Sequence, residues 1–136
     1  MPRYFLDTFY LVALSDPRDQ WYARVLAFSR SLADYHLYTV DEVLAEYLTF
    51  YSAARPKIRD DAVQTVLNVL HDVKITIIPQ SHDSFLDALA FYASRLDKHY
   101  SLTDCVSMQA MRREGLTDVL TNDHHFTQEG FHILFP

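Results

Sequence analysis

Short apolar segments alternate with amphipathic segments along the whole of this 136-residue chain. The apolar segments have the composition of strands that are buried on both faces, and they lie at residues 3–6, 36–40, 73–78, 116–121 and 131–135. Helical patterns separate most of them, and strands that alternate with helices are joined by parallel crossovers. The alternation therefore predicts an α/β fold, a three-layer α/β/α sandwich with a mostly parallel central sheet of about five strands.

Capping patterns predict where the helices begin and end. Ser101 is followed three residues later by Asp104, as in a capping box, and Gly115 then ends that helix. Other helix starts are predicted at residues that favour the first turn, namely Asp16, Pro17, Pro56 and Ser81. The helix after Ser81 is expected to have one apolar face, formed by Phe85, Leu89, Tyr92 and Leu96.

The composition is that of a folded chain with a substantial core. Apolar residues make up 49% of the sequence and aromatic residues 14%. We expect residues 1–136 to form one domain, since single domains commonly have about 100–150 residues. With only two glycines, the chain cannot build the glycine-rich loops of P-loop or dinucleotide-binding enzymes.

The N-terminal segment and the cysteine content indicate a cytoplasmic protein without membrane association. Asp7 would lie within the apolar part of a signal peptide, so export is not expected. No apolar run approaches the roughly 18 residues that a transmembrane helix needs. The single cysteine, Cys105, can form neither an intramolecular disulfide nor a multi-thiolate zinc site.

The net charge of −6 argues against a protein that holds nucleic acid by neutralising its backbone alone. It is compatible with a nuclease, because acids gathered to bind divalent metal ions lower the net charge until the metal arrives. The positions of the acidic residues therefore decide what this charge means.

Four acidic residues fall where a parallel sheet places functional groups, which is beyond the carboxyl ends of its strands. Asp7 directly follows the first predicted strand, and Asp123 comes two residues after the fourth. Glu46 lies on the helix after the second strand, and Asp104 lies in the first turn of the Ser101 helix. We predict that these four carboxylates converge, although Asp104 by itself also fits the role of a helix cap.

Carboxylates that lie close together repel one another unless a cation neutralises them. Oxygen ligands without thiolates favour Mg²⁺ or Mn²⁺. Such a site permits phosphodiester hydrolysis by a metal-activated water. The predicted cluster therefore indicates a hydrolase that acts on phosphodiester bonds and uses Mg²⁺ or Mn²⁺.

The same four positions lie in segments with a recognisable pattern: Phe5–Thr8, Val43–Glu46, Ser101–Cys105 and Leu120–Phe126. In this order, the segments resemble the PIN-domain family of metal-dependent ribonucleases, and within it the VapC-type toxins. The resemblance covers the whole chain. It implies a PIN-like fold and a metal-dependent endoribonuclease, the toxin of a toxin–antitoxin pair.

By this resemblance, the acidic metal-binding and catalytic residues are Asp7, Glu46, Asp104 and Asp123. Thr8 and Thr121 are their hydroxyl neighbours, able to orient ligands, water or substrate. Glu42 competes with Glu46 for the place of the helix acid but fits the pattern less well, and Asp87 is a further spare acid that ranks below the four.

Two further expectations concern binding partners. Arg55, Lys57 and Arg59 form a basic strip beside Phe50 and Tyr51, which could follow an RNA backbone or be an ordinary solvated surface. The helical segments on either side of Pro56 carry more apolar side chains than one buried face requires, among them Tyr47, Phe50, Tyr51, Ile58, Val63 and Val66. We therefore expect a homodimer, as the resemblance also implies, and a small antitoxin protein docked along these helices.

Other classes of protein have some of these features. A phosphotransfer receiver domain needs a late lysine, and no lysine follows Lys98; a dehalogenase-like phosphatase needs a second acid where Phe9 stands. A metal-independent ribonuclease could use His124 and His125, but histidines in a polar turn are more often surface residues. An inactive PIN-like binding module and a housekeeping RNA-processing nuclease remain open.

Overall fold

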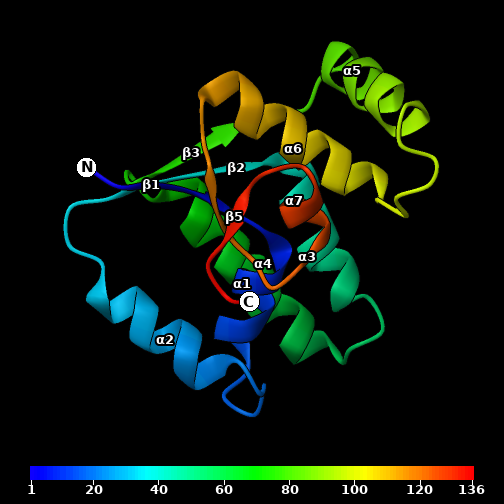
Figure 1. Ribbon diagram of the computed structural model, residues 1–136. Coiled ribbons are helices and arrows are strands. Elements are labelled where there is room, and N and C mark those ends of the chain that lie inside the picture. Colours follow the sequence, from blue (N-terminus) through cyan, green and yellow to red (C-terminus); the bar gives the residue numbers. More distant parts are fainter.

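A computed structural model describes residues 1–136 as a central parallel sheet covered by helices (Figure 1). In chain order the elements are β1 (Arg3–Leu6), α1 (Thr8–Ser15), α2 (Tyr22–Ser31), β2 (His36–Val40), α3 (Asp41–Phe50), α4 (Pro56–His71), β3 (Ile75–Ile78), α5 (His82–Ala93), α6 (Leu102–Glu114), β4 (Asp118–Leu120), α7 (His125–Gln128) and β5 (His132–Ile133). All strand pairs are parallel, in the order β3-β2-β1-β4-β5. The predicted α/β/α class is confirmed.

The strand order reverses between β1 and β4. From β1 the chain builds outward through β2 to β3, then crosses back and adds β4 and β5 on the other side of β1. Right-handed crossovers of this kind put α1 to α4 on one face of the sheet and α5 to α7 on the other, as Figure 1 shows. The reversal opens a crevice beyond the carboxyl ends of β1 and β4.

The core explains why the strands are so apolar. A single cluster of 28 buried residues fills both interfaces between sheet and helices. In the middle of the sheet, Phe5 and Leu6 of β1 and Val119 and Leu120 of β4 are buried by helices on both sides. No helix of the structure is both long and apolar enough to cross a membrane.

The start of the first helical region differs from the prediction. Helix α1 was not predicted, because its sequence is apolar all round and has no helical period. The helix predicted to start at Asp16 and Pro17 instead begins at Tyr22. Asp16 accepts a hydrogen bond from the backbone N–H of Arg18 at 2.9 Å, and Asp19 accepts one from that of Trp21 at 2.7 Å. These side chains stabilise turns in place of a helix start.

The ends of the outer strands also differ. The predicted strand at 73–78 begins only at Ile75, and Val73 is 91% exposed. The strand predicted at 131–135 is reduced to His132–Ile133, and the short helix α7 before it was not predicted. Both strands lie at an edge of the sheet, where one neighbour is missing and pairing ends sooner.

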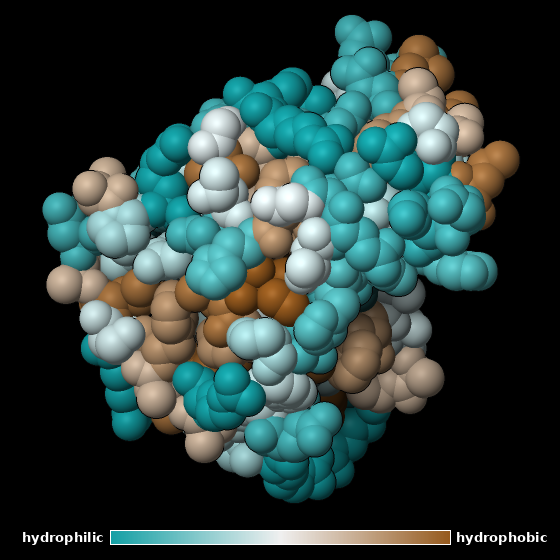
Figure 2. Space-filling view, viewed as in Figure 1, coloured by the Kyte–Doolittle hydropathy of each residue, from teal (hydrophilic) through white to brown (hydrophobic).

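The predicted core face of α5 is wrong. Phe85, Leu89 and Tyr92 are exposed, as is Leu96 beyond the end of the helix. The buried residues, Ala88 and Phe91, lie on the neighbouring stripe of the helix, because α5 packs almost solely against α6. The helix therefore projects from the body of the molecule, and Figure 2 shows apolar side chains at the outer edge of this projection.

The predicted caps of α5 and α6 are confirmed. Ser81 and Ser84 form a reciprocal capping box at the start of α5, and Ser101 and Asp104 form one at the start of α6. Gly115 ends α6 in the left-handed conformation with φ of +67°, and the N–H of the next residue then donates to the carbonyl of Met111 at 2.8 Å. These caps fix where α6 begins and ends.

Gly115 provides a test of this helix end. Because a side chain in the left-handed conformation costs about 1 kcal/mol, Gly115→Ala should lower the melting temperature by roughly 3 °C. Space is not the cause, since an added Cβ would lie 3.9 Å from the nearest atom, Arg3 Nη2. Gly115→Asn is the control, because asparagine tolerates this conformation and should lose less. Equal melting of wild type and Gly115→Ala, measured by calorimetry, would contradict the assignment.

Candidate metal centre

Asp7 occupies the floor of the crevice between β1 and β4. It follows the last residue of β1, and its neighbour across the sheet is Thr121, which follows the last residue of β4. The Thr121 hydroxyl donates to Asp7 Oδ2 at 2.8 Å. Asp7 is only 7% exposed, so this bond holds a carboxylate that is largely shielded from water. The geometry exists because adjacent parallel strands end at the same level.

Burial raises the pKa of Asp7 to about 7. The hydrogen bond from Thr121 opposes this rise, and the nearby charges of Asp104 and Glu46 add to it. Burial also raises the pKa of Asp104, and the charge of Asp123 raises it further. These carboxyl groups therefore lie close enough to repel one another, as the sequence analysis predicted for a cluster.

Glu46 reaches the cluster from α3. The hydroxyl of Thr8, in the first turn of α1, donates to Glu46 Oε1 at 2.5 Å. Helices α1 and α3 pack side by side on the same face of the sheet, so this contact fixes the direction of the Glu46 side chain. Both predicted threonines, Thr8 and Thr121, thus hydrogen-bond a predicted acid.

Asp104 combines the two roles that the sequence left open. Its Oδ2 accepts from the backbone N–H of Ser101 at 3.0 Å, which is the cap interaction. The same oxygen lies 3.6 Å from His125 Nδ1, so the cap also places the carboxylate at the cluster. The cap interaction at the start of α6 therefore holds the Asp104 carboxylate, a candidate metal ligand, in place.

Asp123 is held by the turn after β4. Its backbone N–H donates to Thr121 Oγ1 at 3.1 Å, and its Oδ1 accepts from the backbone N–H of His125 at 2.9 Å. Thr121 therefore connects Asp123 to Asp7, since the same hydroxyl donates to the Asp7 carboxylate. This turn also brings His125 toward the acids.

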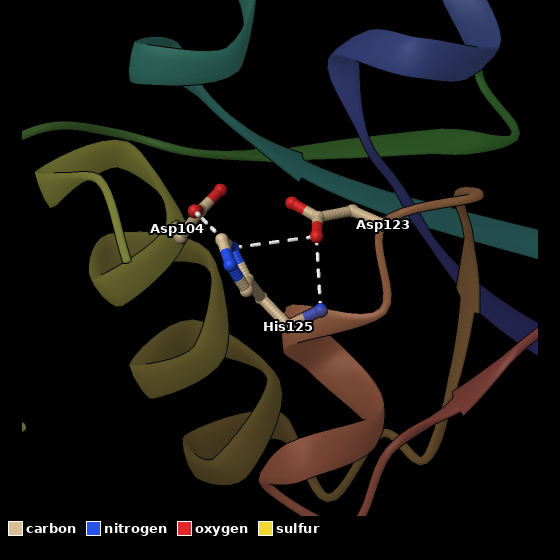
Figure 3. Close-up of side chains that lie close together, drawn as sticks. All are labelled: Asp104, Asp123 and His125. Carbon is tan, nitrogen blue, oxygen red and sulfur yellow. Dashed lines mark hydrogen bonds and ion pairs between the residues drawn. The ribbon is translucent and has the colours of Figure 1, made fainter. Parts of the chain in front are cut away.

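His125 was named from the sequence only for the metal-independent alternative and was expected at the surface, but it turns toward the acids. Figure 3 shows its ring between the two carboxylates, with Nδ1 3.6 Å from Asp104 Oδ2 and 3.4 Å from Asp123 Oδ1. The Nδ1 atom is buried and has no hydrogen-bond partner. Ligand atoms of all three residues lie within 4.8 Å of one another. The adjacent His124 is exposed, which agrees with the surface role expected for it.

A hollow of about 470 Å³, called here the acidic hollow, brings the predicted residues together. All four acids and both threonines line it: Asp7, Thr8, Glu46, Asp104, Thr121 and Asp123. Six further residues line it that were not predicted as part of a site core, among them Asp19, Trp21 and Phe50. The aromatic rings of Trp21 and Phe50 supply flat apolar surface beside the acids.

The basic strip is not part of the acidic hollow. Arg55, Lys57 and Arg59 lie at the start of α4, and none of them lines it. Lys57 pairs with Asp61 of the same helix, at 2.5 Å. The strip and the acidic hollow are therefore separate features, although Phe50, which was predicted beside the strip, does line the hollow.

An ion-pair network around Glu129 lies next to His125. The Glu129 side chain is only 6% exposed, and it accepts hydrogen bonds from Arg95, Arg112 and the Tyr100 hydroxyl. Burial alone would raise the pKa of Glu129, but these three donors outweigh it and lower the pKa to about 2. The Tyr100 ring packs on the His125 ring with centroids 5.3 Å apart. The network therefore fixes the wall against which His125 rests.

The donor set fits a small divalent cation. Four carboxylates offer oxygen ligands of the kind that Mg²⁺ and Mn²⁺ prefer, and the unpartnered Nδ1 of His125 adds one nitrogen. A bound cation would also offset the burial and the repulsion that together raise the pKa values of Asp7 and Asp104. The residues that would hold it come from the end of β1, from α3, from the start of α6, and from the β4–α7 turn with the first residue of α7, far apart in sequence.

Solved structures of three bacterial proteins have the same fold. VapC20 of Mycobacterium tuberculosis, described as a toxin that cleaves the sarcin-ricin loop, has a TM-score of 0.81 and 21% identity, over 93% of this chain and 95% of that chain. FitAcB of Neisseria gonorrhoeae has a TM-score of 0.65 and 18% identity, over 95% and 94% of the two chains. VapBC2 of Rickettsia felis, bound to DNA from its promoter, has a TM-score of 0.64 and 16% identity, with 96% of each chain covered.

At these identities the likeness shows a shared fold. A search of the curated proteins found no match to the sequence. The sequence does match the PIN domain over residues 4–131, which is nearly its whole length. This match and the parallel sheet with acids at its switch point lead to one conclusion: the chain belongs to the PIN domain family.

Proposed function

We propose that the chain is a divalent-metal-dependent endoribonuclease and the toxin of a toxin–antitoxin pair. The observation that carries the proposal is that four carboxylates line one hollow at the switch point of the sheet, and that ligand atoms of Asp104, Asp123 and His125 lie within 4.8 Å of one another there. VapC20, which has this fold, is described as a toxin that cleaves the sarcin-ricin loop, and this supports RNA as the substrate. We place the protein in the cytoplasm, where such a substrate lies.

In this proposal the metal ligands are Asp7, Glu46, Asp104, Asp123 and His125. When bound, Mg²⁺ or Mn²⁺ would lower the pKa of a water molecule and stabilise negative charge on the scissile phosphate. Thr121 holds the Asp7 carboxylate in one orientation, and Thr8 does the same for Glu46. Trp21 and Phe50 lie at the acidic hollow and offer stacking surfaces for an unpaired RNA base.

The histidine favours Mn²⁺ over Mg²⁺ as the physiological ion. Mg²⁺ takes oxygen ligands almost alone, whereas an imidazole suits the transition metals better. The His125 Nδ1 is buried beside two carboxylates and has no other partner. We therefore propose that Mn²⁺ binds more tightly than Mg²⁺ at this centre.

Exposed apolar side chains support the proposed partners, a second copy of the chain and an antitoxin. On α3 and α4 they are Leu48, Phe50, Val63, Leu67 and Leu70. The expectation was wrong for Tyr47, which is buried and hydrogen-bonded to Ser15. Helix α5 adds a second exposed apolar surface that the sequence analysis had assigned to the core.

The first test concerns the chemistry of the cut. Purified protein should cleave RNA with Mn²⁺ or Mg²⁺, stop in EDTA, and leave a 5′-phosphate and a 3′-hydroxyl, because the attacking group is water from outside the RNA. Asp7→Asn should abolish cleavage, while His124→Ala, with an exposed side chain, should keep most of it. Cyclic-phosphate ends formed in EDTA would instead show attack by the RNA's own 2′-hydroxyl and overturn the proposal.

The second test isolates His125. His125→Ala should weaken Mn²⁺ binding by roughly tenfold and Mg²⁺ binding by much less, because only Mn²⁺ gains from the nitrogen ligand. Calorimetric titration measures both affinities, and the nitrogen coupling in the electron spin resonance of bound Mn²⁺ should disappear in the variant. His124→Ala is the matched control. If the two variants bind Mn²⁺ equally well, His125 is not a ligand.

The third test uses the pH dependence of metal-free stability. The pKa of Asp7 is about 7 in the folded protein and 3.8 ordinarily, so between these values the folded state binds more protons than the unfolded state. The contribution of Asp7 to the free energy of unfolding of the protein therefore falls as pH rises toward 7. Asp7→Asn removes this loss, so its stability advantage over wild type should grow between about pH 5 and about pH 8 in EDTA. Parallel denaturation curves at both pH values would contradict the assignment.

A further inference from the structure

A second hollow lies beside the acidic hollow and contains a buried carboxylate oxygen without a partner. This side pocket, of about 430 Å³, lies between the start of α3, the loop before α5, and the first turns of α5 and α6. Glu42 of α3 lines it, and Glu42 Oε1 is buried and accepts no hydrogen bond. Leaving a buried charged acceptor unsatisfied is costly, so the oxygen points to an absent donor.

A third hollow lies between the side pocket and the acidic hollow. This third hollow, of about 340 Å³, shares Glu42 and Thr103 with the side pocket and Glu46 with the acidic hollow. Glu42 and Glu46 are one helical turn apart on α3, about 6 Å along its axis. An RNA strand with one phosphate among the acids could therefore place the base of a neighbouring nucleotide in the side pocket.

The lining of the side pocket selects against phosphate and for a flat ring. It contains no lysine or arginine, and the Glu42 carboxylate would repel an anion. At its mouth the rings of His82 and Phe85 lie nearly parallel, with an angle of 21° and centroids 6.2 Å apart. Phe85 is 42% exposed although it is aromatic, so its face is free to stack. Unpaired RNA bases bind to aromatic faces of this kind.

The donors of guanine match a carboxylate better than those of any other RNA base. Guanine presents N1–H and N2–H₂ side by side, so both oxygens of one carboxylate can accept from it. Adenine and cytosine each place an acceptor next to their amino group, and uracil flanks its N–H with two carbonyl oxygens. The side-chain amide of Gln80, which also lines the side pocket, can donate to the O6 of guanine.

We infer that the side pocket is a guanine-binding subsite, in which Glu42 reads N1–H and N2–H₂ while the base stacks on Phe85. This inference rests on the proposed ribonuclease function and adds its base preference: cleavage beside an unpaired guanosine. The backbone N–H of Gln80 donates to Asp41 Oδ2 at 2.8 Å, which ties the loop of the side pocket to the same end of α3 as Glu42. This bond holds the loop in place, and the buried Glu42 Oε1 must turn toward the side pocket for both carboxylate oxygens to accept from the base.

Binding of mononucleotides tests the subsite without any need for cleavage. In EDTA, the amide resonances of Glu42 and Thr103 should shift with GMP, with affinity at least roughly tenfold higher than for AMP, CMP or UMP. IMP, which lacks the N2 amino group, should bind with intermediate affinity. Glu42→Gln keeps the shape but replaces one acceptor with a donor, so it should abolish the preference for GMP. Asp83→Asn, an exposed charge change next to the side pocket, is the control and should keep it.

Cleavage of a random-sequence RNA provides the second arm. Sequencing the product ends should show guanine enriched at one fixed position beside the cut for wild type and Asp83→Asn, and no enrichment for Glu42→Gln. Cleavage without base preference, together with equal binding of the four nucleotides, would overturn the subsite and leave the ribonuclease proposal intact. A protein that prefers GMP but does not cleave would instead overturn the ribonuclease proposal. Tighter binding of an arginine amide than of GMP would show that the side pocket receives a protein side chain, and would also overturn the inference.

Discussion

The hydrogen bond from Thr121 to the Asp7 carboxylate joins the ends of β1 and β4, where the strand order of the sheet reverses. Each partner of this bond depends on the fold around it. Asp7 reaches the crevice because β1 is central, and Thr121 meets it because β4 pairs with β1 in parallel register. The same hydroxyl accepts from the backbone N–H of Asp123, so the turn that carries Asp123 and His125 is attached to the same point. The candidate metal centre is thus built outward from one buried pair.

This arrangement concentrates negative charge at a place where water is largely excluded. Burial and neighbouring acids raise the pKa of Asp7, so the metal-free protein pays in stability for the cluster. Such a cost is compatible with function, because groups held ready for a ligand are destabilising until it binds. The Glu129 network shows the opposite solution to the same problem: two arginines and one tyrosine donate to that buried carboxylate and lower its pKa to about 2. Glu129 is thus neutralised by its own basic donors, whereas no lysine or arginine lines the acidic hollow.

In the two proposals, the acidic hollow cleaves the RNA and the side pocket recognises one of its bases. The carboxylates at the strand ends are placed by the sheet, whereas Glu42 and Phe85 belong to the first turns of α3 and α5. Helix α5 packs almost solely on α6, so its outer apolar face is exposed. Its N-terminal turn lines the side pocket. The element that forms one wall of the side pocket is therefore the one least constrained by the core.

The sequence by itself determined the parallel α/β class, the caps of α5 and α6, and the four acids that the structure brings together, since apolar strands, capping residues and strand-end carboxylates are local patterns. It did not determine α1 or the start of α2, where an apolar stretch without a period and two aspartate turns override simple helix signals. Only the tertiary structure decided that Phe85 and Leu89 are exposed, that His125 turns toward Asp104 and Asp123, and that Glu42 Oε1 is buried without a donor. The physical reason is that burial and side-chain partners depend on which layer covers a helix and which loops meet at a sheet edge. Those contacts join residues far apart in the chain, and no local pattern records them.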